Sequence, residues 1–431
     1  MKRLVAALAL ACVLPGLAAA PALAAPAVNG VFPLKSLDGS NAKLVAGPDG
    51  NIWVAVNSGG NDVARVTPAG EVTEFELNGI SEASGIAVGP EGKLWVTGSS
   101  AVASFSPTDP KGSASPTMLA AIVGPSPIVA GPDGQMWVAT LNTVLHFDPA
   151  DPAGAVPIAV AGLQPKDIDA AGPLLAVADG NGGAPRIATF TTAGVEKDYT
   201  VGNAAQGVAG GPGDQLAYSA PDAKEAGLIT PPGPAKVTEV EGDPFGVAFG
   251  ADGAYWYARS AKDDVARLTT DGQVSYLGGF PEKYFPRQIA GGPGNTLWVT
   301  MEIPGENIYA VARISGLEPS EEGGGAPSAA PRTKIVKGPK KRVRTTRKRA
   351  KVKFRFRANV GGARFQCALV KLRKGKRSKA VFKSCKSPRT YKLKPGRYRF
   401  KVRAIADGRV DRTPATRAFR VIRVGKHKAK R

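Results

Sequence analysis

Short apolar segments alternate with glycine-containing turns along residues 43–314, and the alternation recurs in units of similar length. In the first complete unit, segments rich in β-branched, alanine and aromatic residues occupy residues 43–46, 52–56, 63–67 and 72–77. The turns within this unit include Pro-Asp-Gly and Pro-Ala-Gly, which are typical connections between neighbouring strands. Each unit is therefore predicted to fold as four short β-strands.

One motif repeats at the turn before the second strand of each unit. The sequence reads GPDGNIWV from Gly47, GPEGKLWV from Gly89 and GPDGQMWV from Gly131. Weaker copies begin at Gly172, Gly211, Gly250 and Gly292. Successive motifs start 42, 42, 41, 39, 39 and 42 residues apart, and all five tryptophans hold one position of the motif. Seven units of four strands are typical of a seven-bladed β-propeller with the tryptophan packed between blades.

The seventh unit, residues 288–314, supplies only three clear strands before the repeats stop. Near the N-terminus, residues 30–34 (GVFPL) match the fourth-strand pattern of residues 71–77 (EVTEFEL) and directly precede the first unit. We therefore expect an N-terminal strand to complete the last blade and to close the ring without an exposed sheet edge.

A different pattern begins at residue 333, where apolar and basic residues alternate. Val352, Phe354 and Phe356 point to one face of a predicted strand, and residues 398–404 repeat the alternation. Such alternation is expected of sandwich strands and supports a small β-sandwich over residues 333–423, so the fold class is all-β, a seven-bladed propeller followed by a sandwich. The intervening positions form two basic stripes, the candidate polyanion-binding residues Lys351, Lys353, Arg355, Arg357, Arg397, Arg399, Lys401 and Arg403.

Charge divides the chain where the patterns change. Residues 332–431 contain 39 Lys and Arg against two acids, a net charge of +37, whereas the rest of the chain carries −15. Residues 316–332 (GLEPSEEGGGAPSAAPR) offer almost nothing to bury and are predicted to be a flexible linker. The predicted division is a propeller at 25–315, this linker, the sandwich at 333–423 and a basic tail at 424–431.

The N-terminus has the organisation of a secretory signal peptide. Two basic residues precede an apolar run, and Ala22-Leu23-Ala24 provides a cleavage site that would remove residues 1–24. The apolar run is too short for a membrane span, and the residues before Cys12 fit a lipid-attachment site poorly. No other segment is apolar enough to cross a bilayer, so we expect an exported protein.

Two cysteines remain in the mature chain, Cys367 and Cys385, and an even count in an exported protein favours a disulfide. Neither these sulfurs nor the two histidines, His146 and His427, have neighbours that complete a metal site at ligand spacing. We therefore predict no metal ion and no cofactor.

The propeller repeats resemble those of the virginiamycin B lyases, also called streptogramin lyases. The resemblance covers residues 30–315 and rests on GPDG-x-x-W-V followed by Val-Ala-Arg-Val at 63–66 or Val-Ala-Arg-Leu at 265–268. It implies a catalytic histidine eleven residues before a blade tryptophan and a metal-binding glutamate three residues after it.

No unit of this chain carries that histidine–glutamate pair. The histidine positions hold Ala42, Ser84, Ser126, Asp167, Gln206, Phe245 and Arg287. The glutamate positions hold Val56, Gly98, Thr140, Asp179, Ala220, Arg259 and Met301. We therefore identify no catalytic residue and expect a protein that binds its ligand without transforming it. The candidate ligand-binding residues are Arg259, Arg287 and Asp167, with solvated surface arginines as the alternative.

Residues 333–421 resemble the immunoglobulin-like or fibronectin-III-like modules of exported actinobacterial proteins. The matching segments are FRF at 354–356, GARFQC at 362–367, SCKSPRTY at 384–391, GRYRFKVRA at 396–404 and TPATRAF at 413–419. The resemblance implies that Cys367 and Cys385 are the cysteine pair of the module. This chain carries Lys or Arg on the outer faces where typical members carry Ser, Thr, Asp or Glu.

Outside a cell, so basic a surface attracts polyanions, and binding would release counterions and weaken steeply with salt. The candidate partners are teichoic-acid-like phosphates, acidic glycans and anionic lipids, which would retain the exported protein at the cell envelope. Docking of the basic module on an acidic propeller, or solubility alone, are the alternatives, and the absence of a base-reading module disfavours nucleic acid. We expect the propeller funnel to hold a ligand or partner of its own. The competing function is a lyase-like or lactonase-like enzyme that uses other residues.

Overall fold

The computed structural model describes residues 25–35, 42–58, 60–181, 183–317, 333–358, 364–372, 382–406, 409–410 and 414–424. The predicted signal peptide, residues 318–332 of the predicted linker and residues 425–431 of the predicted tail lie outside these ranges. Within them every regular element is a β-strand, apart from one 3₁₀ turn at Pro221–Ala223 (η1), which confirms the all-β class. No helix in this described part of the chain is long and apolar enough to span a membrane.

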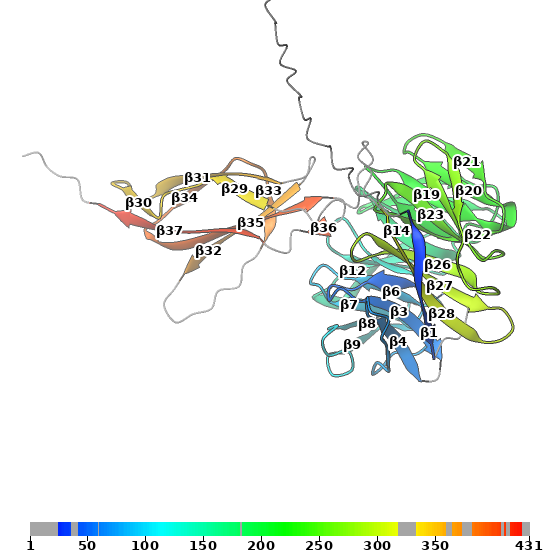
Figure 1. Cartoon of the computed structure of the whole chain (residues 1–431). Coiled ribbons are helices and arrows are strands. Elements are labelled where there is room, and N and C mark those ends of the chain that lie inside the picture. Colours follow the sequence, from blue (N-terminus) through cyan, green and yellow to red (C-terminus); the bar gives the residue numbers. More distant parts are fainter. Residues whose placement is uncertain are drawn as a thin grey trace, which may run out of the picture.

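Seven four-stranded antiparallel sheets form the blades of the propeller (Figure 1). Blade 1 contains β2 (Leu44–Ala46), β3 (Ile52–Ser58), β4 (Asn61–Val66) and β5 (Val72–Phe75). Blade 2 contains β6 (Gly85–Val88), β7 (Leu94–Thr97), β8 (Ala101–Phe105) and β9 (Ser115–Met118). Blade 3 contains β10 (Ile128–Ala130), β11 (Met136–Thr140), β12 (Thr143–Asp148) and β13 (Asp151–Ala159).

The remaining blades continue in the same order. Blade 4 contains β14 (Pro165–Ala171), β15 (Leu174–Asp179), β16 (Arg186–Thr191) and β17 (Gly194–Thr200). Blade 5 contains β18 (Gly207–Gly210), β19 (Leu216–Ala220), β20 (Glu225–Ile229) and β21 (Ala235–Glu239). Blade 6 contains β22 (Pro244–Phe249), β23 (Ala254–Arg259), β24 (Val265–Thr269) and β25 (Val274–Leu277). Blade 7 contains β26 (Phe285–Gly292), β27 (Thr296–Ile303), β28 (Ile308–Ser315) and the N-terminal β1 (Ala27–Leu34).

Two sets of contacts close the ring. The first strands of successive blades contact one another all the way round, with β26 of blade 7 against β2 of blade 1, so these strands line the central axis. At the rim of blade 7, β1 pairs antiparallel with β28, from Ala27 opposite Ser315 to Leu34 opposite Tyr309 (Figure 1). The strand expected from residues 30–34 is therefore present, and it covers what would otherwise be an open edge.

The repeated tryptophan packs between neighbouring blades. Trp53 is fully buried in an apolar cluster that also contains Val96 and Phe105 of the next blade. Its indole Nε1 donates a hydrogen bond of 3.1 Å to Oδ1 of Asp49 in the Pro-Asp-Gly turn. Equivalent bonds join Trp137 to Asp133 and Trp256 to Asp252. The acid of the turn therefore satisfies the one polar group that the buried indole carries.

The first glycine of the motif leaves space for the same indole. A Cβ atom on Gly89 would lie 2.5 Å from Cδ1 of Trp95, and one on Gly250 would lie 2.8 Å from Cδ1 of Trp256. These distances are shorter than any normal carbon–carbon contact. The motif thus combines a tight turn, an indole hydrogen bond and a packing space in eight residues.

The chain from residue 333 onward forms two facing sheets. The first has the order β29 (Thr333–Lys337), β31 (Ala350–Ala358) and β34 (Arg389–Leu393). The second has the order β30 (Arg342–Thr345), β37 (Ala415–Arg423), β35 (Gly396–Ala406), β32 (Arg364–Leu372) and β33 (Lys383–Cys385), with β36 (Arg409–Val410) beside β35. Their inner side chains form one apolar cluster, in which Phe354 stacks on Phe400 with ring centroids 3.9 Å apart.

A disulfide between Cys367 and Cys385 joins β32 to β33 at the edge of the larger sheet. Both half-cystines are buried in the apolar cluster. The predicted disulfide-linked sandwich is therefore confirmed.

Candidate functional site

An ion pair crosses the central axis of the propeller. Lys43 precedes β2 of blade 1, and its Nζ lies 2.7 Å from Oδ1 of Asp167 on β14 of blade 4. The same Nζ donates a hydrogen bond of 3.1 Å to Oε1 of Gln288 on β26 of blade 7. The two charged side chains are 15% and 14% exposed, so water screens the pair only partly. Asp167 is thus engaged by an internal cation.

A second carboxylate lies beside this pair. Asp169 accepts hydrogen bonds from the backbone N–H groups of Ala170 (2.8 Å) and Gly210 (2.9 Å), and Asp167 accepts one from Val208 (3.2 Å). The two acids therefore join the first strands of blades 4 and 5, which share no β-ladder. Burial raises the pKa of Asp169 to about 6; the hydrogen bonds and Lys43 oppose the shift, and Asp167 adds to it.

The two predicted ligand-binding arginines each have a carboxylate of their own. Arg259 is buried, and its Nη1 lies 3.0 Å from Oδ1 of Asp264, while its Cζ lies 4.3 Å from the ring centroid of Tyr276. Arg287 pairs with Glu302 of the same blade. The Nε of each arginine is buried without a hydrogen-bond partner among the described residues.

No hydrogen bond or ion pair among the described residues joins Asp167, Arg259 and Arg287 to one another; each bonds a different partner. Their role in ligand binding stays a prediction. His146, set aside on sequence grounds, stacks on Trp137 with ring centroids 4.5 Å apart, and its Nδ1 lies 2.7 Å from Oε1 of Gln135. Its surroundings are those of a packing residue.

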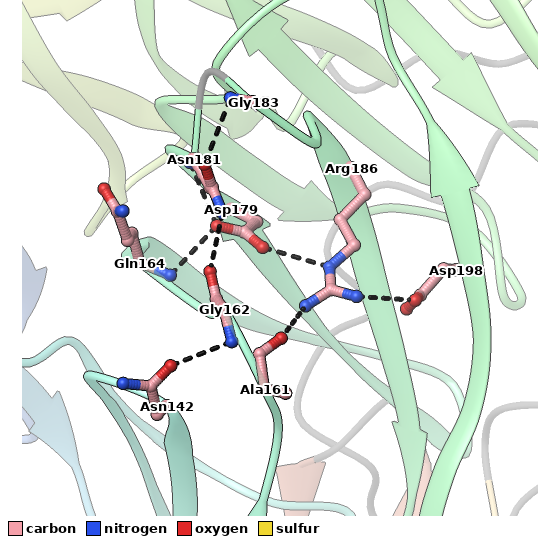
Figure 2. Close-up of polar contacts among 9 residues, drawn as sticks. All are labelled: Asn142, Ala161, Gly162, Gln164, Asp179, Asn181, Gly183, Arg186 and Asp198. Atoms are coloured by element: carbon pink, nitrogen blue, oxygen red, sulfur yellow. Dashed lines mark hydrogen bonds and ion pairs between the residues drawn. The ribbon is translucent and has the colours of Figure 1, made fainter.

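Blade 4 carries a buried acid at the position where the lyase resemblance implies a metal-binding glutamate. Figure 2 shows that Asp179 lies at the centre of a polar network. Its Oδ1 accepts hydrogen bonds from the backbone N–H groups of Gln164 (2.9 Å) and Asn181 (3.0 Å), and its Oδ2 accepts one from Nε of Arg186 (3.0 Å). The side chain of Asp179 is 1% exposed, and both oxygens of its carboxylate are bonded to groups of the protein itself.

The guanidinium of Arg186 extends the network to other segments. It donates hydrogen bonds to Oδ2 of Asp198 on β17 (2.9 Å) and to the carbonyl oxygen of Ala161 in the connection from blade 3 (3.2 Å) (Figure 2). Blade 6 has the reverse arrangement at the equivalent turn. There the cation, Arg259, ends the second strand, and the acid, Asp264, precedes the third. Opposite charges on the two sides of this turn were the sequence signal for both pairs, although neither pair was predicted.

No group of three or more His, Cys, Asp or Glu residues in the described ranges is arranged to hold a metal ion. The acids named above instead bind lysine, arginine or backbone N–H groups.

The outer face of the smaller sandwich sheet carries a dense group of cations. On β31, Lys351, Lys353, Arg355 and Arg357 alternate with buried apolar residues, so all four side chains lie on the outer face. Cations also stand opposite them on both neighbouring strands: Lys334 faces Arg357, Lys337 faces Arg355, and Lys392 faces Lys351. We call these residues the β31 face: Lys334, Lys337, Lys351, Lys353, Arg355, Arg357 and Lys392.

An open cleft of about 570 Å³ adjoins the β31 face. Its charged lining is entirely cationic and consists of Lys337, Lys340, Arg342, Lys351, Lys353 and Arg355. The remaining lining residues, Gly338, Pro339, Val343 and Val352, are uncharged. The described part of the sandwich contains no Asp or Glu, so no carboxylate within it neutralises these cations.

The second predicted stripe lies on β35 and is more dispersed. On β32 the residues opposite Arg397, Arg399 and Lys401 are apolar (Leu372, Val370 and Ala368). On β37 only Arg397 faces a cation, Arg420, whereas Arg399 and Lys401 face Ala418 and Thr416. Arg403 donates a hydrogen bond of 2.8 Å to Oε1 of Gln366, and its Cζ lies 4.3 Å from the ring centroid of Phe382. The structure therefore places the predicted polyanion-binding residues on two sheets, with the denser group on β31.

No family model and no curated protein sequence matches this chain. Among solved structures, a streptogramin B lyase superposes with a TM-score of 0.57 at 18% identity, over 66% of this chain and 96% of that chain. An inactive variant of virginiamycin B lyase from Staphylococcus aureus with quinupristin gives a TM-score of 0.55 at 17% identity, over 66% and 99%.

The propeller has the fold of these lyases. Hydrazine synthase from Kuenenia stuttgartiensis is almost as similar, with a TM-score of 0.54 at 16% identity over 66% of this chain and 98% of that chain. Enzymes with such different names share this fold, so the structural similarity shows the architecture of the propeller alone. Any activity has to be argued from the residues of the site.

Proposed function

We propose that this chain is an exported binding protein whose β31 face binds linear polyanions of the cell envelope and whose propeller mouth binds a separate ligand or partner. The cationic cleft carries the proposal, because six Lys and Arg side chains line it and no acid lies nearby in the described sandwich. Teichoic-acid-like phosphates, acidic glycans and anionic lipids are the partners that this charge would attract.

The like charges on the β31 face favour an external anion over mere solubility. Lys334 and Arg357, Lys337 and Arg355, and Lys351 and Lys392 stand directly opposite each other on neighbouring strands. Like charges in such cross-strand positions repel and lower the stability of the sheet. A bound polyanion would remove this repulsion and stabilise the folded module by mass action.

Export rests on the signal-peptide pattern of residues 1–24 and fits the disulfide between Cys367 and Cys385. Retention at the envelope would follow from the β31 face. For the propeller mouth, the candidates are Arg259 and Arg287, whose buried Nε groups have donor capacity left, together with Asp167.

The test compares two variants of equal charge in a sedimentation assay with purified cell envelopes. Lys351, Lys353 and Arg355 are changed to Gln in one variant, and Arg347, Lys348 and Arg349, which are exposed in the turn before β31, in the other. We expect the first variant to sediment far less than the wild type at low salt and the second to sediment nearly as well. Equal loss from both variants would mean that only total charge matters, and no sedimentation of the wild type would refute envelope binding.

The alternative is a lyase-like or lactonase-like enzyme, suggested by the fold alone. Of the positions that the resemblance implies, Arg259 and Arg287 are engaged with Asp264 and Glu302, and Asp179 is engaged with Arg186. Incubation of the protein with quinupristin and a divalent metal, followed by mass spectrometry, tests this alternative. Ring opening that depends on the protein would replace the binding proposal for the propeller.

A further inference from the structure

We propose that the β31 face is built for a phosphodiester polymer whose successive phosphates are joined through a short polyol, with the polymer lying along β31. This inference rests on the proposed polyanion-binding function and adds the chemical class and direction of the ligand.

The spacing of the cations on β31 indicates the distance between successive phosphates in the ligand. Lys351, Lys353, Arg355 and Arg357 occupy alternate positions of one strand, so their Cα atoms are about 7 Å apart, twice the rise per residue. A linear polymer with one phosphate for each three-carbon unit has a similar repeat when extended. It can therefore place one phosphate at each cation in turn.

The neighbouring strands reinforce this row. An irregularity in the pairing of β29 with β31, between Ile335 and Lys337, brings Lys337 opposite Arg355 where regular pairing would bring Val336. Lys334 and Lys392 extend the cation pairs toward the two ends of the row. A phosphate at each of these points would meet cations from two strands, and a guanidinium can hold two of its oxygens at once.

The cleft beside the row fits an uncharged linker. Its lining includes the uncharged residues Gly338, Pro339 and Val343 together with the β31 cations Lys351, Lys353 and Arg355. A polyol linker has no charge to satisfy and can contact such uncharged residues. A polymer whose phosphates are joined directly, with no uncharged linker between them, would place some of its charges against these residues.

A single-stranded nucleic acid has a comparable phosphate repeat, but its recognition normally uses aromatic side chains on which the bases stack. The aromatic residues of β31, Phe354 and Phe356, are buried in the core of the sandwich. The outer positions of β31 hold only lysine and arginine. The face therefore favours a phosphate polymer without bases.

The experiment measures Kd of the full mature chain for four probes of equal total charge at one ionic strength. The probes are a glycerol phosphate polymer, inorganic polyphosphate, an abasic oligodeoxynucleotide and oligo-dT. We expect the glycerol phosphate polymer and the abasic oligonucleotide to bind about fivefold tighter than polyphosphate, the gain from about one additional hydrogen bond of ordinary strength. A surface that senses charge density alone would prefer polyphosphate, because the denser polymer releases more counterions.

Two single variants test whether the row of cations on β31 determines the preference for the glycerol phosphate polymer over polyphosphate. Lys353→Gln removes the middle of the row and should reduce the preference to near onefold, whereas Lys348→Gln, in the exposed turn before β31, should lower affinity for every probe without changing the preference. Thermal unfolding of both variants shows whether the sandwich remains folded.

The outcomes separate the two proposals. Binding of no probe by the wild type overturns polyanion binding itself. Binding without preference, or with preference for polyphosphate, overturns only the inference on the ligand class. Much tighter binding of oligo-dT than of the abasic oligonucleotide overturns it in favour of single-stranded nucleic acid.

Discussion

The ammonium group of Lys43 in blade 1 lies 2.7 Å from the carboxylate of Asp167 in blade 4, so one ion pair connects blades on opposite sides of the ring. In a propeller most contacts join a blade only to its two neighbours. This pair therefore couples parts of the ring that the blade-to-blade packing leaves independent.

Removal of the cation should destabilise the propeller. Lys43→Gln leaves Asp167 and Asp169 close together without their shared counter-charge, and we expect a loss of about 2 kcal/mol in the free energy of unfolding. Chemical denaturation of the two proteins measures it. The matched control is Lys111→Gln, which breaks an exposed pair with Glu76 at 3.3 Å and should cost about 0.5 kcal/mol or less. Equal losses in the two variants would show that the pair of Lys43 and Asp167 contributes no more to the free energy of unfolding than an exposed ion pair does.

Asp169 should make the stability of the propeller depend on pH. Its pKa in the folded chain is about 6, above the value of an unfolded aspartate, so the folded state binds a proton that the unfolded state does not bind between about pH 4 and 6. The contribution of this group to stability therefore increases as the pH falls through 6. We expect the stability of the wild type relative to Asp169→Asn to rise by about 2 kcal/mol between pH 7 and pH 4.5.

The control is Asp271→Asn, for which we expect stability to depend on pH in the opposite direction. Asp271 is exposed, and a hydrogen bond from Thr269 lowers the pKa of its carboxyl group below the usual value. The stability of the wild type relative to Asp271→Asn should therefore fall, not rise, as the pH decreases. Thermal unfolding at several pH values measures both comparisons, and the same slope in the two variants would refute the assignment of the effect to Asp169.

Gly89 should resist substitution by alanine. The new Cβ would lie 2.5 Å from the indole of Trp95, so the indole would have to move within a packed interface between blades. We expect Gly89→Ala to lower the free energy of unfolding by about 1–3 kcal/mol. Gly278→Ala is the control, since a Cβ there meets no atom within 4 Å and the backbone conformation is not one that favours glycine. A neutral Gly89→Ala would mean that the interface can relax.

The disulfide should stabilise the sandwich selectively. Changing Cys367 and Cys385 together to serine opens a loop with a sequence separation of 18 residues, for which the chain-entropy model gives about 3 kcal/mol. Differential scanning calorimetry should show a lower transition temperature for the sandwich and an unchanged one for the propeller. A shift of both transitions would instead indicate that the two units unfold together.

Much of the fold could be predicted because its signals are local or periodic. The tryptophan motif, the turn residues and the match between residues 30–34 and 71–77 lie within short windows, and they gave the blade count and the closing strand. Alternation on β31 likewise predicted which lysines and arginines face outward. These inferences needed no knowledge of how distant segments meet.

The contacts of the candidate site could not be predicted in this way, because they join residues that are far apart in the sequence. The partner of Asp167 is Lys43 only because the ring closes and brings blades 1 and 4 across the axis, and no window of sequence contains both residues. The partner of Arg287, Glu302, lies on the neighbouring strand β27, and their contact depends on an irregularity of strand pairing next to Arg287. The density of the β31 face likewise depends on an irregularity of pairing near Lys337.

The pairing of β1 with β28 also has a mechanical consequence. The chain beyond Leu317, which is itself buried in the propeller core, continues from β28, so a pull on the C-terminal module is transmitted to this strand. With β1 on one side and β27 on the other, two ladders of hydrogen bonds resist that pull. Without β1, a load applied to Ser315 would peel β28 from a single neighbour, one bond at a time. The N-terminal strand thus anchors the point at which force enters the ring.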